Sequence, residues 1–175
     1  MALRILKLIL GLLLLQTCFY AYSDDDQFVI RVGDTISIKV YNELDLTTKA
    51  KVGNTGVLKI PLIGEVLVVN KTPQQLSSEL EAAYLDGYLV DPSVSVVIDS
   101  YRPFYVRGAV SSPGVYDFDF DMNVEQALAL AKGLKDRASK REWYIIRGTD
   151  KSRVKVTRES RIFPGDILEI EESLF

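Results

Sequence analysis

Histidine is absent from this sequence of 175 residues, and cysteine occurs only once, as Cys18. Histidine is the commonest general base and the commonest metal ligand in proteins, so its absence removes most acid–base and metal-assisted mechanisms. A pair of carboxylates could still hydrolyse a glycoside, and such a pair leaves no signature in a sequence. Because histidine is absent and no catalytic motif stands out, we expect no enzyme, no cofactor and no metal site.

Only one long apolar run exists, and it lies near the start of the chain at residues 8–15 (LILGLLLL). Arg4 and Lys7 precede the run, and a small-x-small cleavage site, Ala-Tyr-Ser, follows it at residues 21–23. This pattern predicts a signal peptide over residues 1–23 and secretion of the mature chain. The run is too short to span a bilayer comfortably, which disfavours a retained anchor.

Cys18 offers a second interpretation of this segment, as the acylated cysteine of a lipoprotein. Gln16 and Thr17 stand where a lipobox has small residues, so we favour ordinary cleavage over an outer-membrane lipoprotein anchored through Cys18. After ordinary cleavage the mature chain has no cysteine. It then has neither a disulfide nor a thiolate metal site.

The mature chain is expected to have fewer basic residues than acidic residues. Removing Arg4 and Lys7 leaves 19 Lys and Arg against 24 Asp and Glu. Nucleic-acid binding depends on a surplus of Lys and Arg, so we expect no nucleic-acid partner. The three aspartates at residues 24–26 are expected to be a solvated terminus rather than a cation site.

Residues 51–84 contain the clearest local pattern in the chain. Gly and Asn at residues 53–56 favour a tight turn, and the apolar runs at 57–60 and 66–69 predict two short strands. Pro61 cannot donate to a strand ladder, so the first strand is expected to end there.

A helix is expected to follow these strands and to cover one face of them. Thr72 is suited to the N-cap, Pro73 to the first turn, and Gln75 completes a capping box. Leu76, Leu80, Ala83 and Tyr84 fall on one helical face, and Gly87 is expected to end the helix.

Apolar alternation predicts the remaining strands, while residues 42–50 are polar enough to be a loop or an irregular edge. The expected strands lie at residues 28–30, 35–40, 94–98, 105–116 (a hairpin), 143–146, 154–156 and 162–170. Asn123, with Gln126 three residues later, predicts a second helix that ends at Gly133. The sequence therefore predicts an α+β fold with two small sheet-plus-helix domains, at residues 24–101 and 102–175.

Three ordered motifs resemble the polysaccharide export domain of the outer-membrane polysaccharide export family of Gram-negative bacteria. They are the opening FVIRVGDTISI at residues 28–38, the central KVGNTGVLKIPLIGEV with its following TPQQL, and the closing DPSVSV at residues 91–96. The opening pattern I-x-x-G-D-x-[IL]-x-I returns at residues 162–170. We interpret this echo as one tight turn feeding a strand, used twice.

The second unit resembles the soluble ligand-binding β-grasp domain, which follows the export domain in this family. The residues that carry the likeness are VRGAV at 106–110, PGVY at 113–116, AKGL at 131–134 and PGDILEI at 164–170. Only five residues follow Ile170, whereas a membrane-spanning helix needs about 20. We therefore expect a short form that lacks the C-terminal membrane helix of its relatives.

The resemblance implies a non-catalytic periplasmic component of a machine that exports capsular or extracellular polysaccharide. Its implied partners are the polysaccharide, an inner-membrane polysaccharide co-polymerase, further copies of the chain in a homo-oligomer, and a separate outer-membrane channel, expected to be a β-barrel. The alternative is a soluble periplasmic saccharide-binding or regulatory protein that forms no conduit. Ring formation would separate these two functions.

Aromatic and arginine side chains cluster just after the predicted domain boundary. Sugars stack on aromatic faces and bind planar polar groups, so Tyr101, Arg102, Tyr105 and Arg107 are candidate polysaccharide contacts, although core packing would also explain such aromatics. The motif turns are expected to be structural. They contain Gly33, Asp34, Gly56, Pro61, Gly64, Gly108, Pro113, Gly114, Gly165 and Asp166.

The processing of the N-terminus can be tested directly by intact-mass measurement on exported protein. We expect the mature chain to begin at Asp24, because cleavage follows the Ala-Tyr-Ser site. A diacylglyceryl mass on Cys18 would contradict this expectation.

Overall fold

A three-stranded antiparallel sheet forms the base of the first half of the molecule. The computed structural model describes residues 28–148 and 150–173, so the predicted signal peptide, Cys18 and the aspartates at 24–26 lie outside the described residues. The strand order is β2-β1-β5, with β1 at Thr35–Val40, β2 at Glu43–Lys51 and β5 at Val94–Ser100. Ile36, Ile38 and Val40 of β1 are buried, as their alternation predicted.

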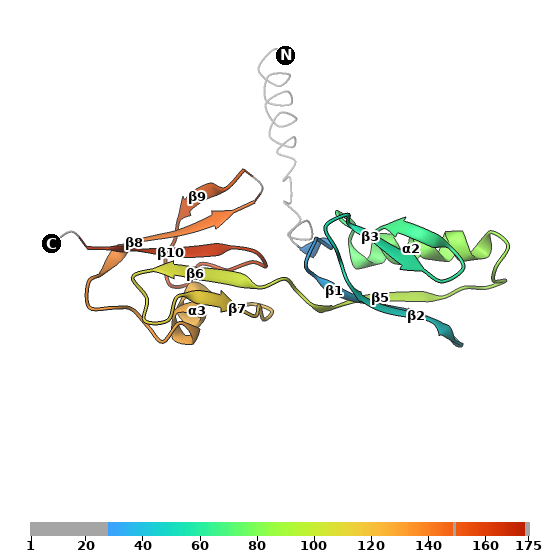
Figure 1. Ribbon diagram of the computed structural model, residues 1–175, viewed down its shortest axis with the longest axis horizontal. Helices are drawn as coiled ribbons and strands as arrows, with labels where there is room; N and C mark the ends of the chain where they lie inside the picture. Colours follow the sequence, from blue (N-terminus) through green and yellow to red (C-terminus); the bar gives the residue numbers. More distant parts are fainter. Residues whose placement is uncertain (1–27, 149, 174–175) are drawn as a thin grey trace, which may run out of the picture.

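A hairpin and a helix complete this half, and Figure 1 shows them together on one side of the sheet. The hairpin joins β3 (Val57–Ile60) to β4 (Gly64–Leu67), and α2 spans Pro73–Leu85. Both bonds of the predicted capping box at Thr72 and Gln75 are present. The helix buries Leu76, Leu80 and Tyr84 in the first hydrophobic core. The Tyr84 hydroxyl donates to the carbonyl of Pro61 at 3.2 Å, and burial raises the pKa of that phenol.

The second half is a five-stranded sheet with one helix on one face, as a β-grasp-like fold requires. The strand order is β7-β6-β10-β8-β9, and its first and last strands, β6 (Phe104–Gly108) and β10 (Ile167–Glu172), are parallel neighbours at the centre. The other strands are β7 (Gly114–Tyr116), β8 (Ala138–Arg147) and β9 (Ser152–Lys155). All three of the remaining pairings are antiparallel.

Helix α3 (Val124–Leu130) packs its apolar face into a second hydrophobic core beneath this sheet. Asn123 and Gln126 form the predicted capping box, and Val124, Ala127 and Leu128 are buried. They join Phe104, Val106, Trp143, Ile145, Leu168 and Ile170 from the strands. The α+β fold class expected from the sequence is therefore confirmed, with a sheet and a helix in each half.

One local prediction was partly right and one was wrong. Residues 42–50, predicted to be a loop or an irregular edge, lie almost entirely within the nine-residue edge strand β2, whose only buried residue is Leu46. The register of this edge strand is irregular, with a shift between Ile38 and Val40 of β1, but the segment is a paired strand and not a loop. Residues 28–30 form no strand, since Ile30 bonds only to the turn at Asn70 and Lys71.

The motif glycines occupy turns that need a left-handed backbone. Gly33, Gly56, Gly64, Gly108 and Gly165 all have φ between +71° and +96°. Pro61 follows the end of β3, and Pro113 precedes Gly114 at the start of β7. At Gly108, which ends β6, a Cβ would also lie 2.0 Å from the Ile170 carbonyl oxygen on the neighbouring strand.

Within residues 28–148 and 150–173, no helix combines the length and the apolar character needed to cross a membrane.

We expect Gly108→Ala to destabilise the second half by about 3 kcal/mol or more. Overpacking costs about 1–3 kcal/mol, and a left-handed backbone adds about 1–2 kcal/mol for a residue with a Cβ. The matched control is Gly133→Ala, whose φ is +81° but whose Cβ would meet nothing within 4 Å. Urea unfolding followed through the fluorescence of Trp143, buried in the same core, measures both losses. Equal losses would show that the contact with Ile170 has no effect.

Candidate functional site

The four predicted saccharide contacts do not gather at one place. Tyr101 and Arg102 lie in the short connection between β5 and β6, where the two halves of the molecule meet. Tyr105 and Arg107 lie on β6 and point to the face of the sheet opposite the core residues Phe104 and Val106. These two locations have different surroundings and suit different roles.

Arg102 is held by a buried carboxylate at the junction. Asp34 has no exposed surface, and its Oδ1 accepts the backbone N–H of Arg102 at 2.8 Å. The Arg102 guanidinium lies 3.2 Å from both carboxylate oxygens, and the backbone N–H of Arg31 donates to Oδ2 at 2.9 Å. Asp34 therefore closes its own turn and also binds the start of the second half.

The second copy of the I-x-x-G-D-x-[IL]-x-I motif, at residues 162–170, also contains a buried aspartate that is paired with an arginine. Asp166 is 1% exposed, and its Oδ2 accepts the backbone N–H of Phe163 three residues earlier at 2.8 Å. Arg147 binds both Asp166 oxygens, at 2.8 and 2.6 Å, and its guanidinium lies 4.3 Å from the centre of the Phe163 ring. The repeated sequence pattern thus corresponds to one turn, closed by a buried Asp and paired with a distant Arg.

Aromatic rings surround this junction and come from both halves. Phe28 contacts Tyr101, Phe120 and Phe163, with ring centres 5.2 to 6.0 Å apart, and Tyr101 also meets Phe118 at 5.6 Å. Burial raises the pKa of the Tyr101 phenol; the charge of Asp34 adds to this shift and that of Arg102 opposes it. Tyr101 and Arg102 are thus engaged in contacts within the protein itself.

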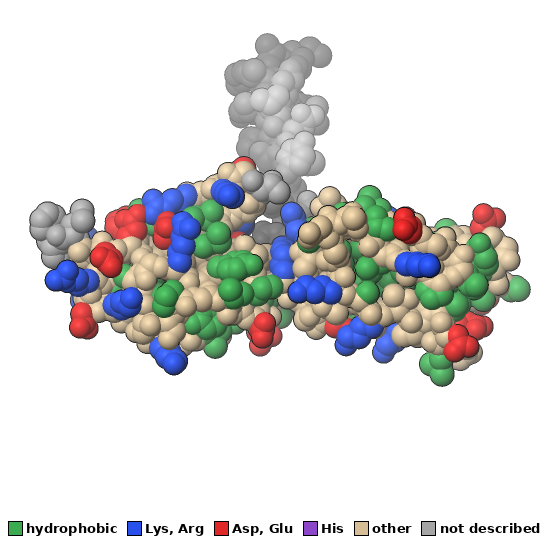
Figure 2. Space-filling model, viewed as in Figure 1, with side chains coloured by type: hydrophobic (Ala, Val, Ile, Leu, Met, Phe, Trp, Pro, Cys, Tyr) green, Lys and Arg blue, Asp and Glu red, His purple; other side chains and the backbone are tan. Residues whose placement is uncertain are grey.

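The face of the five-stranded sheet that points away from α3, here called the open face, carries a different set of side chains. Figure 2 shows hydrophobic side chains gathered over β6 and β10, with charged side chains of both signs towards β8 and β9. Tyr105 is 43% exposed and stands opposite Val115 on β7 and Ile167 on β10. An exposed aromatic ring with apolar neighbours therefore occupies one part of this face.

A charged network occupies the rest of the open face. Arg107 donates to Glu169 Oε1 through Nε and Nη2, at 3.0 and 2.7 Å, and Arg153 donates to Glu169 Oε2 at 2.9 Å. The Arg153 guanidinium also binds Glu171 and lies 3.6 Å from the centre of the Tyr144 ring. These contacts hold the Arg107 and Arg153 guanidinium groups at the two oxygens of Glu169, with the Arg153 group stacked over the Tyr144 ring.

The network continues from Tyr144 to Glu142 and Lys155. Lys155 Nζ lies 2.7 Å from Glu142 Oε1, and the Tyr144 hydroxyl donates to Oε2 of the same carboxylate. The hydrogen bond from Lys155, and next the one from Tyr144, lowers the pKa of Glu142. The hydrogen bond to Glu142 raises the pKa of Tyr144, and burial adds to that shift. The carboxylate is therefore kept ionised, as a hydrogen-bond acceptor.

One spacing used by some serine enzymes, Ser-x-x-Lys, occurs at Ser152 and Lys155. Both residues lie on strand β9, where positions three apart point to opposite faces. Ser152 donates to the carbonyl of Arg147 at 3.2 Å, and Lys155 is paired with Glu142. Among the described residues, no group of three or more acidic or cysteine side chains is arranged to hold a metal ion.

The open face offers an exposed aromatic ring next to planar, charged hydrogen-bonding groups. Such a surface suits a ligand with an apolar ring face and many hydroxyl groups. Tyr105 and Arg107 were named from the sequence, whereas Tyr144, Arg153 and Glu169 were missed. Alternation along β8 and β10 would have indicated their outward direction, but their proximity to Arg107 depends on the strand order.

Comparison with known proteins gives two further findings. The family of polysaccharide biosynthesis/export proteins matches residues 23–99. The exopolysaccharide production protein ExoF of Rhizobium meliloti (strain 1021) is 31% identical over 115 residues, which cover 63% of this chain and 27% of that protein. The chain therefore spans only about a quarter of the length of this relative.

We expect Asp34→Asn to destabilise the protein by about 3 kcal/mol, because it removes one partner of a largely buried ion pair. The matched control is Asp99→Asn, which breaks a surface pair with Lys49 and should cost at most about 1 kcal/mol. Urea unfolding measured by circular dichroism gives both values. A loss at Asp34 no larger than that at Asp99 would contradict the role of this pair.

Proposed function

From the match of residues 23–99 to the polysaccharide biosynthesis/export family, we propose that the protein belongs to this family and is a non-catalytic component of a machine that exports an extracellular or capsular polysaccharide. It acts in the periplasm, between an inner-membrane polysaccharide co-polymerase and a separate outer-membrane channel. Several copies assemble around the path of the polymer and guide it.

The family match is the observation that carries this proposal. The similarity to a protein named for exopolysaccharide production supports the same polymer class. The open face supports a role in contact rather than in chemistry, because its carboxylates Glu142, Glu169 and Glu171 are all held in ion pairs. For Glu142, the hydrogen bonds from Lys155 and Tyr144 lower the pKa, which makes this carboxylate a poor proton donor at neutral pH.

Within this function, we assign polymer contact to Tyr105 and Arg107 on the open face. The exposed ring of Tyr105 offers a stacking surface for a sugar, and Arg107 with Glu169 offers donors and acceptors beside it. Tyr101 and Arg102 receive a structural role instead, because the buried Asp34 engages Arg102 and Tyr101 packs among the rings of the junction.

Deletion of the gene should abolish secretion of the polymer and leave synthesis of its lipid-linked precursor intact. An export component acts after synthesis, so the defect is expected only in the secreted fraction. Quantification of secreted polymer and of the precursor pool tests this outcome. Unchanged secretion would refute the proposed function. Shortening of the polymer by the purified protein would instead indicate an enzyme.

We expect Tyr105→Ala to weaken binding of the secreted polymer to the purified protein about tenfold, since loss of an aromatic contact costs on the order of 1 kcal/mol. Tyr88→Ala removes a tyrosine of similar exposure, 51%, from the other half and should leave affinity unchanged. Calorimetric titration measures both affinities. Equal effects of the two substitutions would exclude the open face as the contact surface.

A further inference from the structure

The positive charge of the chain is concentrated in one segment. Residues 132–161 contain 11 of the 21 Lys and Arg but only four of the 24 Asp and Glu. The strongest part is residues 132–141 (KGLKDRASKR), here called the basic run, which has five cations and one acid. The mature chain as a whole is acidic, so this run stands out against the rest of the molecule.

The cations of the basic run are not used for internal ion pairs. Its five cationic side chains are exposed, and none of them has a salt-bridge partner among residues 28–148 and 150–173. They are Lys132, Lys135, Arg137, Lys140 and Arg141. The five later cations with partners, by contrast, are Arg147, Arg153, Lys155, Arg158 and Arg161.

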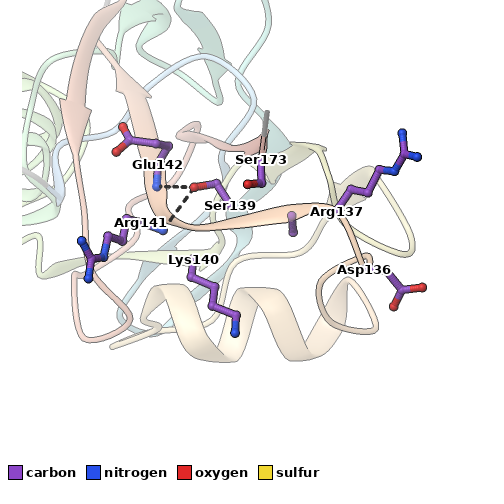
Figure 3. Close-up of a pocket in the computed structure, with 8 residues that line it drawn as sticks. Asp136, Arg137, Ser139, Lys140, Arg141, Glu142 and Ser173 are labelled. Carbon is purple, nitrogen blue, oxygen red and sulfur yellow. Dashed lines mark hydrogen bonds between the residues drawn. The ribbon is translucent and has the colours of Figure 1, made fainter. Parts of the chain in front are cut away.

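The backbone that carries these cations is fixed. The N–H of Lys135 donates to the carbonyl of Ala109 at 3.0 Å, and the Arg137 carbonyl accepts the N–H of Ser173 at 2.7 Å. The Ser139 hydroxyl accepts the N–H groups of Arg141 and Glu142, as the dashed lines in Figure 3 show. The backbone thus presents these like-charged residues in a fixed order around the start of β8.

Three surface hollows follow the basic run. The largest, of about 850 Å³, is lined by residues 136–142 and Ser173. It shares Asp136 and Arg137 with a second hollow and Lys140 and Arg141 with a third, each of about 500 Å³. Because they share lining residues, the three hollows adjoin one another along the start of β8, and they are here together called the groove.

Figure 3 shows that Arg137, Lys140 and Arg141 point in three different directions around this groove. They do not converge on one point, so the arrangement does not suit a single small anion. It suits an extended chain that carries negative charges at intervals. The acids in the groove are Asp136, Glu142, Glu159 and Glu172, of which Glu142 is already paired with Lys155.

We propose that this groove, at the start of β8, binds an acidic polysaccharide through its carboxylate, phosphate or sulfate groups. The inference rests on the proposed function and adds the charge class of the polymer and a second contact surface, which adjoins the open face at Glu142 and Lys155. Arg137 and Arg141 can bind a carboxylate through two parallel hydrogen bonds, while Lys135 and Lys140 act as point charges.

An anionic membrane surface is the competing ligand class, and the structure disfavours it. A peripheral membrane site combines cations with large apolar side chains that enter the bilayer. The basic run has only Leu134, which is half-buried and bridges to Val110, and Ala138, which is buried. The run therefore lacks an apolar anchor.

The test uses the exported full-length chain with polygalacturonate as the acidic probe and dextran of similar length as the neutral probe. The variant Arg137→Gln/Lys140→Gln/Arg141→Gln removes three charges from the groove. The control Lys39→Gln/Lys51→Gln/Lys59→Gln removes three exposed charges from β1, β2 and β3, which have no salt-bridge partner among the described residues. Circular dichroism melting confirms that both variants fold.

We expect the chain to bind polygalacturonate, and to bind it more weakly as salt rises because a polyanion releases counterions on binding. The groove variant should bind at least about tenfold more weakly and the control within about twofold. Equal losses in both variants, or binding of dextran as strong as that of polygalacturonate, would overturn the proposal.

A membrane ligand is tested with vesicles of phosphatidylglycerol and phosphatidylethanolamine. Co-sedimentation that the groove variant abolishes, without binding of polygalacturonate, would refute the proposal in favour of an anionic lipid surface. Secretion by the deletion strain separates this inference from the proposed function. Lost secretion together with unaltered binding by the groove variant would refute only the acidic groove.

Discussion

The buried ion pair between Asp34 and Arg102 is the constraint on which the arrangement of the molecule depends. Asp34 is fully buried, and removing its charge from water is unfavourable unless the carboxylate is paired and fully hydrogen-bonded. Its bonds to Arg31 and Arg102 meet this requirement, and they join a turn of the first half to the first residues of the second. Gly33 and Gly165 lie against the Arg102 side chain, where a Cβ would come within 3.2 and 2.9 Å of its atoms. The two halves are thus joined by a closely packed contact rather than by the chain connection alone.

The residues at the junction between the two halves support the structure, whereas residues elsewhere remain available to a ligand. Asp34, Asp166 and Arg102 are largely buried and paired within the protein, and they leave little for an external partner, whereas the Arg147 side chain is 41% exposed. The side chains of the open face are supported differently, by cross-strand neighbours on the rigid pair β6 and β10, and they remain exposed. Under the proposed function, contact with a long polymer is expected to depend on surfaces of this second kind, whose side chains are exposed on a rigid support.

Short sequence patterns, such as capping boxes and apolar alternation, predicted many of the helices and strands. Contacts between residues far apart in the sequence could not be predicted from such patterns. Both helices were expected from their capping boxes, at Thr72 with Gln75 and at Asn123 with Gln126. Strand β2 was expected only as a loop or an irregular edge, because its few apolar residues, Leu44, Leu46 and Ala50, lie among charged and hydroxyl side chains. Asp34 and Arg102 are 68 residues apart in the sequence, and no local sequence pattern predicts that they form a pair. The outward direction of Tyr105 and Arg107 follows from the buried Phe104 and Val106, but their charged neighbours depend on the order of the strands.

The parallel pairing of β6 with β10 also determines the order in which the second half can fold. The hairpin of β6 and β7 and the hairpin of β8 and β9 are joined within the sheet only through β10, which is the last strand to be synthesised. Contacts between segments this distant in sequence form slowly, because the entropy of closing a long loop is lost before the contacts compensate it. A chain that becomes available from its N-terminus can therefore complete its first core while the second still lacks its central strand. The second hydrophobic core, to which Leu168 and Ile170 of β10 contribute, is therefore complete only when nearly the whole chain is available.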